Sequence, residues 1–299
     1  MRRQGYRFLA TIVLAVCLAV PAWALPQQLI PGGCTIGVKL QAQGPVVTGV
    51  EEASAAEEAG LQKGDVIIAA DGEEIHTTAA LRDCLEKERV ILTVLRNGKE
   101  AKFCVQPKND RLGAYVQDSV AGIGTVTYYD PNTGDFGALG HGVSQADSDQ
   151  LVPVEAGVAV HSSVAEVVKG ACGAPGELKG KFDVDRILGE VVTNHTHGIF
   201  GTMQVPVVGT PIPVAERDEI SAGPAEILSN ISGETVCRYS VEILKIYPNA
   251  DHTGRNLLLQ VTDPALLKNT GGIIRGMSGS PIIQDGKLVG AVTHVCVNL

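Results

Sequence analysis

Short apolar segments separated by turn residues dominate the chain between residues 110 and 299. Apolar and polar residues alternate with a period of two in several of them, as in YSVEILKI at residues 239–246. Such alternation is typical of half-buried β-strands, and regular short strands indicate a barrel or a sandwich. Few segments could form the long helical crossovers of a parallel sheet. The pattern predicts a mainly β fold, with residues 219–228 as the best candidate for a short helix or turn.

The composition agrees with a β-rich chain. The 299 residues include 35 glycines, aromatic residues make up only 4%, and 44% of the residues are hydrophobic, so two domains with sizeable cores are expected. The formal net charge is −9. Because a phosphate backbone requires a basic protein face, this charge argues against nucleic acid as the main partner.

Residues 1–24 have the form of a targeting segment. Three arginines within the first seven residues precede an apolar run over residues 8–24, which ends in Ala22-Trp23-Ala24, the small-x-small pattern of a signal peptidase site. We expect either a cleaved signal peptide or a membrane anchor. Both would carry the rest of the chain across a membrane and leave the arginines inside.

The seven cysteines do not define a metal site. None forms a CxxC pair, so a zinc knuckle is not expected. Cys17 lies in the apolar run, and an exported chain could pair some of the other six. Their spacing leaves the connectivity open, and small buried apolar positions are the alternative.

Residues 30–107 are predicted to form a first, smaller domain. Residues 54–59 are helical in propensity, and residues 77–88 form an amphipathic helix with a threonine N-cap. Strands surround these helices, with the turns marked by Gly60, Asp71-Gly72 and Asn97-Gly98.

This order resembles a PDZ domain, above all in AGLQKGDVIIAADGEEI at residues 59–75. The resemblance implies that a peptide adds as an edge strand and that backbone N–H groups of a preceding loop hold its terminal carboxylate. That loop is expected at Gly33, Ile36, Gly37 and Val38. The alternative is a PDZ fold that docks only on its own neighbouring domain. His76 is expected to be a surface or helix-start residue.

Gly-Met-Ser-Gly-Ser-Pro at residues 276–281 contains a candidate nucleophile, Ser278. Serine and glycine are also common in ordinary turns, so this segment alone leaves both interpretations open. A serine hydroxyl is a weak nucleophile that requires a base, usually histidine, which is itself oriented by an acid.

His141 stands out among the seven histidines, because Gly140 and Gly142 leave its imidazole uncrowded. A lone histidine is more often structural than catalytic. His195 and His197 form an HxH pair that could suggest a metal, but no third ligand follows at helical spacing, and a loop is the favoured interpretation. Neither a metal site nor a cofactor is expected.

Asp263 is the candidate acid. It closes the apolar segment LLLQVTD and precedes Pro264, so its carboxylate would be half-buried and positioned. An acid in a turn at the end of a strand is the alternative interpretation.

The chain as a whole resembles the SpoIVB peptidases, the stage IV sporulation protein B family, over nearly all of residues 25–299. The resemblance rests on the order of an apolar N-terminal segment, LIPGG, a PDZ domain, GHGVS, GIFG, VTDPALL and GMSGSPIIQDGKLVGAVTHV. It implies a chymotrypsin-like double β-barrel over residues 110–299. It also implies that Ser278 is the nucleophile, His141 the general base and Asp263 the orienting acid, with the N–H groups of Gly276 and Ser278 forming the oxyanion hole.

The resemblance further implies an endopeptidase of sporulation signalling, exported into the intermembrane space around the forespore. There it would cleave itself and a regulatory subunit of a membrane-embedded metalloprotease complex, which triggers processing of a late sigma factor. Its PDZ domain would bind peptide C-termini. Family members continue beyond THVCVNL, so a final strand of the second barrel is expected to be missing. A catalytically inactive PDZ adaptor at the membrane remains an alternative. A quality-control protease of the HtrA type is disfavoured, because its PDZ domain usually follows the protease domain.

Overall fold

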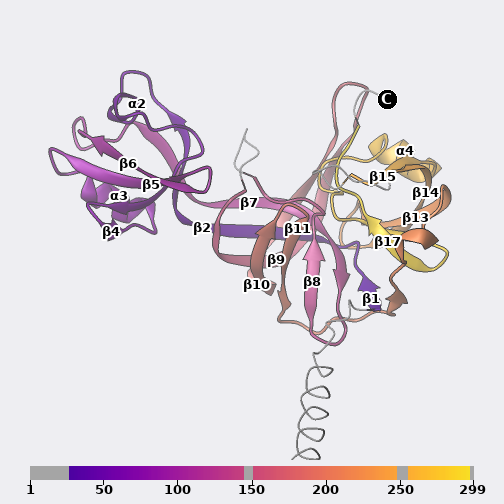
Figure 1. Ribbon diagram of the computed structural model, residues 1–299. Coiled ribbons are helices and arrows are strands. Elements are labelled where there is room, and N and C mark those ends of the chain that lie inside the picture. Colours follow the sequence, from indigo (N-terminus) through magenta and orange to yellow (C-terminus); the bar gives the residue numbers. More distant parts are fainter. Residues whose placement is uncertain (1–26, 145–150, 248–254, 297–299) are drawn as a thin grey trace, which may run out of the picture.

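The computed structural model describes residues 27–144, 151–247 and 255–296. The expected mainly β fold is confirmed (Figure 1). The targeting segment expected at residues 1–24 lies outside the described residues. Among the described residues, no helix is long and apolar enough to cross a membrane.

The larger domain begins with a closed barrel, which we call the first barrel. Its ring closes because β2 pairs with β9 on one side and with β7 on the other. Buried apolar side chains such as Ile36, Leu40 and Phe136 fill its interior. In ring order the strands are β2 (Thr35–Val50), β7 (Ala114–Tyr129), β8 (Asp135–Ala138), β11 (Gly198–Met203), β10 (Glu177–His195) and β9 (Val154–Val168).

A separate antiparallel sheet, the second sheet, follows in the chain. Its core contains Ile227, Val241 and Leu266, the last from helix α4 (Pro264–Thr270). The first barrel and this sheet fit the expected pair of β-barrels. In order the strands are β15 (Leu257–Val261), β14 (Val236–Ile246), β13 (Gly223–Asn230), β16 (Pro281–Gln284) and β17 (Lys287–Ala291).

The prediction of a helix or turn over residues 219–228 is wrong for most of that segment. Only the 3-10 turn η1 (Arg217–Glu219) touches its start, and β13 begins at Gly223. Strand β13 pairs with β14 on one edge and with β16 on the other. Tertiary pairing on both edges outweighs the helical propensity of the Ala-Glu-Ile-Leu residues.

Two short strands extend the sheet from the edge of β7, and the first of them, β1, is labelled in Figure 1. Strand β1 (Gln28–Pro31) pairs with β7 through Ile30 and Tyr129, and β12 (Ile212–Pro213) pairs with the outer edge of β1.

The small domain contains the two helices that the sequence predicts, α2 (Ala55–Ala59) and α3 (Thr78–Cys84). The Ser54 side chain accepts from a backbone N–H of α2, and that helix ends at Gly60 with φ of 85°. Thr77 caps α3 in the same way. The remaining strands of this domain are β3 (Val66–Ala70), β4 (Glu73–Glu74), β5 (Val90–Arg96) and β6 (Lys99–Val105).

Strands β2 and β7 run side by side from the small domain into the first barrel (Figure 1). Residues 35–42 of β2 pair with barrel strands, whereas Val46 pairs with Val66 of the small domain. The small domain is therefore inserted between two barrel strands. Its expected start at residue 30 is corrected to residue 46, because residues 30–42 bury their apolar side chains in the larger domain.

Candidate active site

Residues 276–280, the serine loop, connect α4 to β16. Met277 is fully buried in the core of the second sheet and anchors the loop there. Gly279 has φ of 97°, and a Cβ atom at this position would lie 2.0 Å from the Thr125 carbonyl oxygen. Only glycine fits such a close approach. The loop therefore holds the half-buried Ser278 between two buried residues.

Strand β7 of the first barrel holds the serine loop from the other side. The Thr125 N–H donates to the Ser278 carbonyl oxygen at 3.0 Å, and the Thr125 hydroxyl donates to the Gly276 carbonyl oxygen at 2.8 Å. The Thr127 hydroxyl donates to the Gly279 carbonyl oxygen, also at 2.8 Å. Both threonines are buried. The serine loop is thus held by both the first barrel and the second sheet.

The segment that carries His141 is attached to the same threonine. The Leu139 N–H donates to the Thr125 carbonyl oxygen at 3.0 Å. A Cβ atom at Gly140 would lie 2.9 Å from the Thr293 side chain, which shows how closely this segment passes the chain beyond β17. Thr125 therefore brings the histidine segment and the serine loop to one place.

Asn194, at the end of β10, clamps the chain just after His141. Its side-chain oxygen accepts from the Val143 N–H at 2.8 Å, while its amide group donates to the carbonyl oxygens of Val143 at 2.8 Å and Val152 at 3.0 Å. The sequence analysis did not single out Asn194, and its place next to the HxH pair was the one available signal.

Ser278 lies beside Thr293, and His141 lies beside the next residue, His294. The Ser278 hydroxyl donates to the Thr293 carbonyl oxygen at 3.2 Å. The His141 Nδ1 atom lies 2.9 Å from the Gly142 carbonyl oxygen, and its ring centroid lies 5.9 Å from that of His294. No hydrogen bond joins Ser278 to His141 in the described part of the chain. Catalytic hydrogen bonds often form only when substrate binds, so this geometry is compatible with a base near a nucleophile.

Two backbone N–H groups of the serine loop differ from their neighbours in having no acceptor among the described residues. The Met277 N–H donates to Ile274 at 3.1 Å, and the Gly279 N–H donates to Val292 at 2.7 Å. Within residues 27–144, 151–247 and 255–296, the N–H groups of Gly276 and Ser278 donate to no protein acceptor. A developing negative charge on a substrate carbonyl could take both donors.

Asp263 has a structural role at the start of α4. Its carboxylate accepts from the Leu266 N–H at 2.9 Å and from the Ser240 N–H at 3.5 Å, and Pro264 follows as the first helical residue. This is the geometry of an N-cap. Among the described residues, its carboxylate makes no hydrogen bond to His141.

His294 is a residue of this site that the sequence analysis missed. Its Nδ1 atom lies 2.9 Å from the Thr293 hydroxyl oxygen. Partial burial lowers the pKa of His294, and electrostatic interaction with Arg255 and with His141 lowers this pKa further. The only available signal was its place in the THV segment after the last strand.

The other histidines that were considered lie elsewhere. His195 and His197 stack in the turn between β10 and β11, with ring centroids 5.2 Å apart. No cluster of three or more metal-ligating side chains occurs in the described residues. His76 lies just before α3, between Glu74 at 3.4 Å and Glu155 at 3.5 Å.

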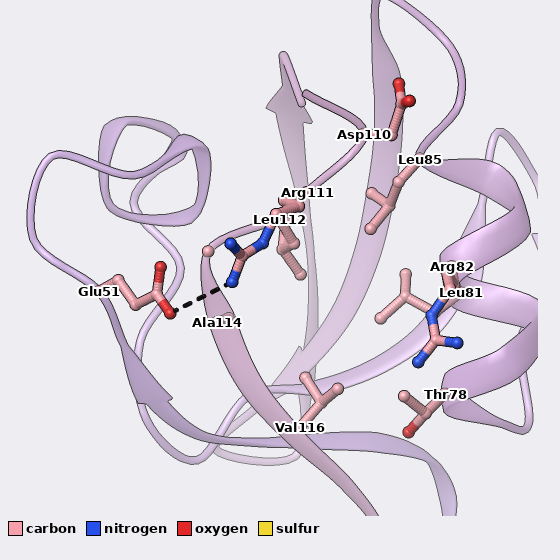
Figure 2. Close-up of a pocket in the computed structure, with 11 residues that line it drawn as sticks. Glu51, Thr78, Leu81, Arg82, Leu85, Asp110, Arg111, Leu112, Ala114 and Val116 are labelled. Carbon is pink, nitrogen blue, oxygen red and sulfur yellow. Dashed lines mark ion pairs between the residues drawn. The ribbon is translucent and has the colours of Figure 1, made fainter. Parts of the chain in front are cut away.

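A groove of about 290 Å³ lies in the small domain between α3 and β7 (Figure 2). Its apolar lining comes from Leu81 and Leu85 of α3 and from Leu112 and Val116. The charged side chains of Glu51, Arg82, Asp110 and Arg111 surround it, and Arg111 reaches toward Glu51 with 3.9 Å between their charged atoms (Figure 2).

The loop before β7 presents backbone donors at one end of this groove. The N–H groups of Leu112 and Gly113 donate to no acceptor in the described part of the chain. Gly113 has φ of 73°, and a Cβ atom there would lie 2.3 Å from Ser54. The signal in the sequence was Leu-Gly immediately before a strand, after the last hairpin of the small domain.

The expected peptide-binding loop at Gly33, Ile36, Gly37 and Val38 is therefore misplaced. Ile36 and Val38 are buried in the first barrel. Gly37 pairs with β7 on one side and with β9 on the other. A strand that is paired on both edges cannot accept a peptide. Gly33 packs against the second sheet, where a Cβ atom would lie 2.7 Å from Leu228.

Two known families match this chain, one in each domain. The family described as SpoIVB peptidase S55 matches residues 108–299. The chain belongs to this family. A PDZ domain matches residues 46–96, which cover the small domain from the end of β2 to the end of β5. The suspected resemblance is confirmed in both parts.

The curated relatives match only parts of their own length. A protein of Agrobacterium fabrum named "Putative zinc metalloprotease Atu1380" is 27% identical over 214 residues, 68% of this chain and 52% of its own length. A "Probable periplasmic serine endoprotease DegP-like" of Chlamydia trachomatis is 42% identical over 66 residues, 21% of this chain and 13% of its own length. The chain thus spans about half of the first relative and a small part of the second.

Proposed function

We propose that this member of the SpoIVB peptidase family is a serine endopeptidase. Ser278 attacks the scissile carbonyl, and His141 accepts the hydroxyl proton and later delivers it to the leaving amine. The N–H groups of Gly276 and Ser278 stabilise the oxyanion. The observation that carries the proposal is the set of bonds from Thr125, which hold the serine loop and the histidine segment together.

Asp263 is proposed as the acid that orients His141, on the family resemblance. Its bonds to α4 and Ser240 give it a second, structural task. The two roles predict different results for Asp263→Asn, which retains an oxygen for the cap but loses the charge. An acid role predicts a large fall in kcat with little change in thermal stability, whereas a cap role alone predicts near-normal kcat.

The biological role proposed here rests on the family. The chain is exported across a membrane by its N-terminal segment and acts in the intermembrane space around a forespore. There it cleaves itself and a regulatory subunit of a membrane-embedded metalloprotease complex, which triggers late sigma-factor processing. The groove between α3 and β7 takes the place of the loop first expected to bind peptide C-termini.

Self-cleavage of the purified chain, together with hydrolysis of fluorescein-labelled casein, tests the activity. The expected result is that the native protein cleaves both and that Ser278→Ala and His141→Gln cleave neither while retaining native circular dichroism. A second candidate, an inactive PDZ adaptor, is favoured by the Ser278 hydroxyl donating to Thr293 rather than to His141. Equal, negligible cleavage by the native protein and by Ser278→Ala would support the adaptor.

A further inference from the structure

Strand β7 connects the two candidate sites. Its first residues form one wall of the groove, and Thr125 and Thr127 on the same strand hold the serine loop. Val116 and Thr125 are nine residues apart, a span of about 30 Å in an extended strand. The serine-loop end of β7 belongs to the first barrel, whereas the groove end belongs to the PDZ domain.

The groove end of β7 has one unpaired edge. The Gly113 carbonyl oxygen accepts from the Glu51 N–H at 2.9 Å, and the Tyr115 carbonyl oxygen accepts from the Thr48 hydroxyl at 3.2 Å. Because backbone groups alternate along an antiparallel strand, those of Ala114 and Val116 face the groove. No strand in the described residues pairs with this edge. A peptide could add there as a strand.

The chemistry of the groove defines its occupant as a peptide with a free C-terminal carboxylate and an apolar last side chain. The two available N–H groups of Leu112 and Gly113 suit a carboxylate. The leucine and valine lining suits the apolar side chain, and the exposed Arg82 favours an acidic residue farther upstream.

Helix α3 forms the second wall of the groove, and Asp118 of β7 is hydrogen-bonded to its first residue. Its carboxylate accepts from the Thr78 N–H at 2.6 Å and from the Thr78 hydroxyl, at the first residue of α3. The pairing of β2 with β7 is irregular at this junction, because Gln41 pairs with Ser119 and Val46 with Gln117. Strand β7 itself continues without a break. A peptide wedged between α3 and β7 therefore acts on β7 at the point where it enters the barrel.

We propose that a peptide bound in this groove raises the reactivity of Ser278 through strand β7. This inference rests on the proposed function. Pairing the open edge restrains β7, and a restrained Thr125 holds the carbonyl groups of the serine loop in place. The N–H groups of Gly276 and Ser278 then stay aimed at the substrate, and preorganised donors lower the barrier of the chemical step. Coupling between two sites of this kind typically changes a rate or an affinity by about fivefold or more.

The test uses the full chain and a fluorophosphonate that labels reactive serines. The added probe is a pool of N-acetylated hexapeptides that end in valine with a free carboxylate, and the control is the same pool with C-terminal amides. The carboxylate pool is expected to increase the labelling rate by about fivefold, and the amide pool is expected to leave it unchanged. Hydrogen exchange of residues 274–280 is expected to slow in parallel.

Two variants of Asp118 separate coupling from binding. Asp118→Asn keeps an acceptor for Thr78 and is expected to retain the stimulation. Asp118→Ala is expected to bind the peptide pool in fluorescence anisotropy and to lose most of the stimulation. Full stimulation in Asp118→Ala, no binding, or peptide binding with neither faster labelling nor slower exchange would overturn the inference. A native chain that is never labelled at Ser278, yet shows slower exchange in the serine loop, would refute the proposed function and leave the coupling intact.

Discussion

Thr125 and Ser278 are joined across two strand assemblies by a hydrogen bond of 3.0 Å from the Thr125 N–H to the Ser278 carbonyl oxygen. The same threonine accepts from the Leu139 N–H and donates its hydroxyl to Gly276. One buried residue therefore binds the two segments that carry the proposed nucleophile, base and oxyanion donor. A serine peptidase needs these three groups held in fixed relative positions before substrate binds.

Removing the Thr125 hydroxyl should loosen the attachment of the serine loop to β7. Thr125→Val removes the bond to the Gly276 carbonyl oxygen but keeps the backbone bond to Ser278. We expect the free energy of unfolding to fall by about 1–2 kcal/mol, since a buried acceptor loses its donor. Phosphonate labelling should slow by about tenfold, the cost of about 1.4 kcal/mol in the barrier. Thr125→Ser, which keeps a hydroxyl, is the matched control, and equal labelling rates in the two variants would contradict the role of this bond.

A side chain at Gly279 should displace the serine loop. The Cβ atom of Gly279→Ala would lie 2.0 Å from the Thr125 carbonyl oxygen, at a residue with φ of 97°. We expect a loss of about 2 kcal/mol or more in stability from strain, together with loss of labelling. Gly122→Ala is the control, because its Cβ atom would meet nothing within 4 Å. Thermal melts and labelling rates give the comparison, and a fully active Gly279→Ala would show that the loop does not depend on this contact.

The Asn194 clamp should affect the base more than the nucleophile. Asn194→Ala leaves the Val143 N–H without its acceptor and the Val152 carbonyl oxygen without the Asn194 amide donor. We expect about 2 kcal/mol less stability and a fall in kcat for casein cleavage with KM nearly unchanged. Asn132→Ala, in an exposed turn, is the control. A rise in KM alone would show that the clamp shapes substrate binding and not the position of His141.

His294 should titrate below an ordinary histidine. Its pKa lies below the usual 6.5, first because of burial and then because of Arg255 and His141. As pH falls through 6.5, the unfolded chain takes up this proton before the folded chain does, so the contribution of His294 makes the fold less stable in acid. NMR titration should show a higher pKa for His294 in His141→Gln. Urea unfolding at pH 7.5 and 5.5 should show a smaller acid loss in His294→Gln than in the native chain, and an equal loss in both would contradict this effect.

Much of the fold was predictable because local signals and tertiary structure agree. The caps at Ser54 and Thr77 and the turn at Gly60 are encoded within a few residues. The helix or turn predicted for residues 219–228 was wrong for most of the segment, because no local pattern shows that β13 pairs on both edges.

The proposed catalytic residues Ser278 and His141 could be singled out from the sequence, whereas the residues that hold their segments could not. Ser278 and His141 lie in distinctive glycine-flanked motifs, and the structure brings Ser278 beside Thr293 and His141 beside the adjacent His294. Thr125 and Asn194 act through bonds to residues far away in the chain, which leave no local pattern. The peptide groove was misplaced because Gly33–Val38 also resembles a glycine-led strand, and only strand pairing shows which edge is open.

Intact mass spectrometry with a serine-reactive phosphonate tests the central claim most directly. The native chain is predicted to gain one phosphonate adduct, mapped by peptide sequencing to Ser278, at a rate that falls at least tenfold in His141→Gln. Ser278→Ala should gain no adduct. A native chain that stays unlabelled while its circular dichroism shows it to be folded, or an adduct that maps to another serine, would contradict the assignment of Ser278 as the nucleophile.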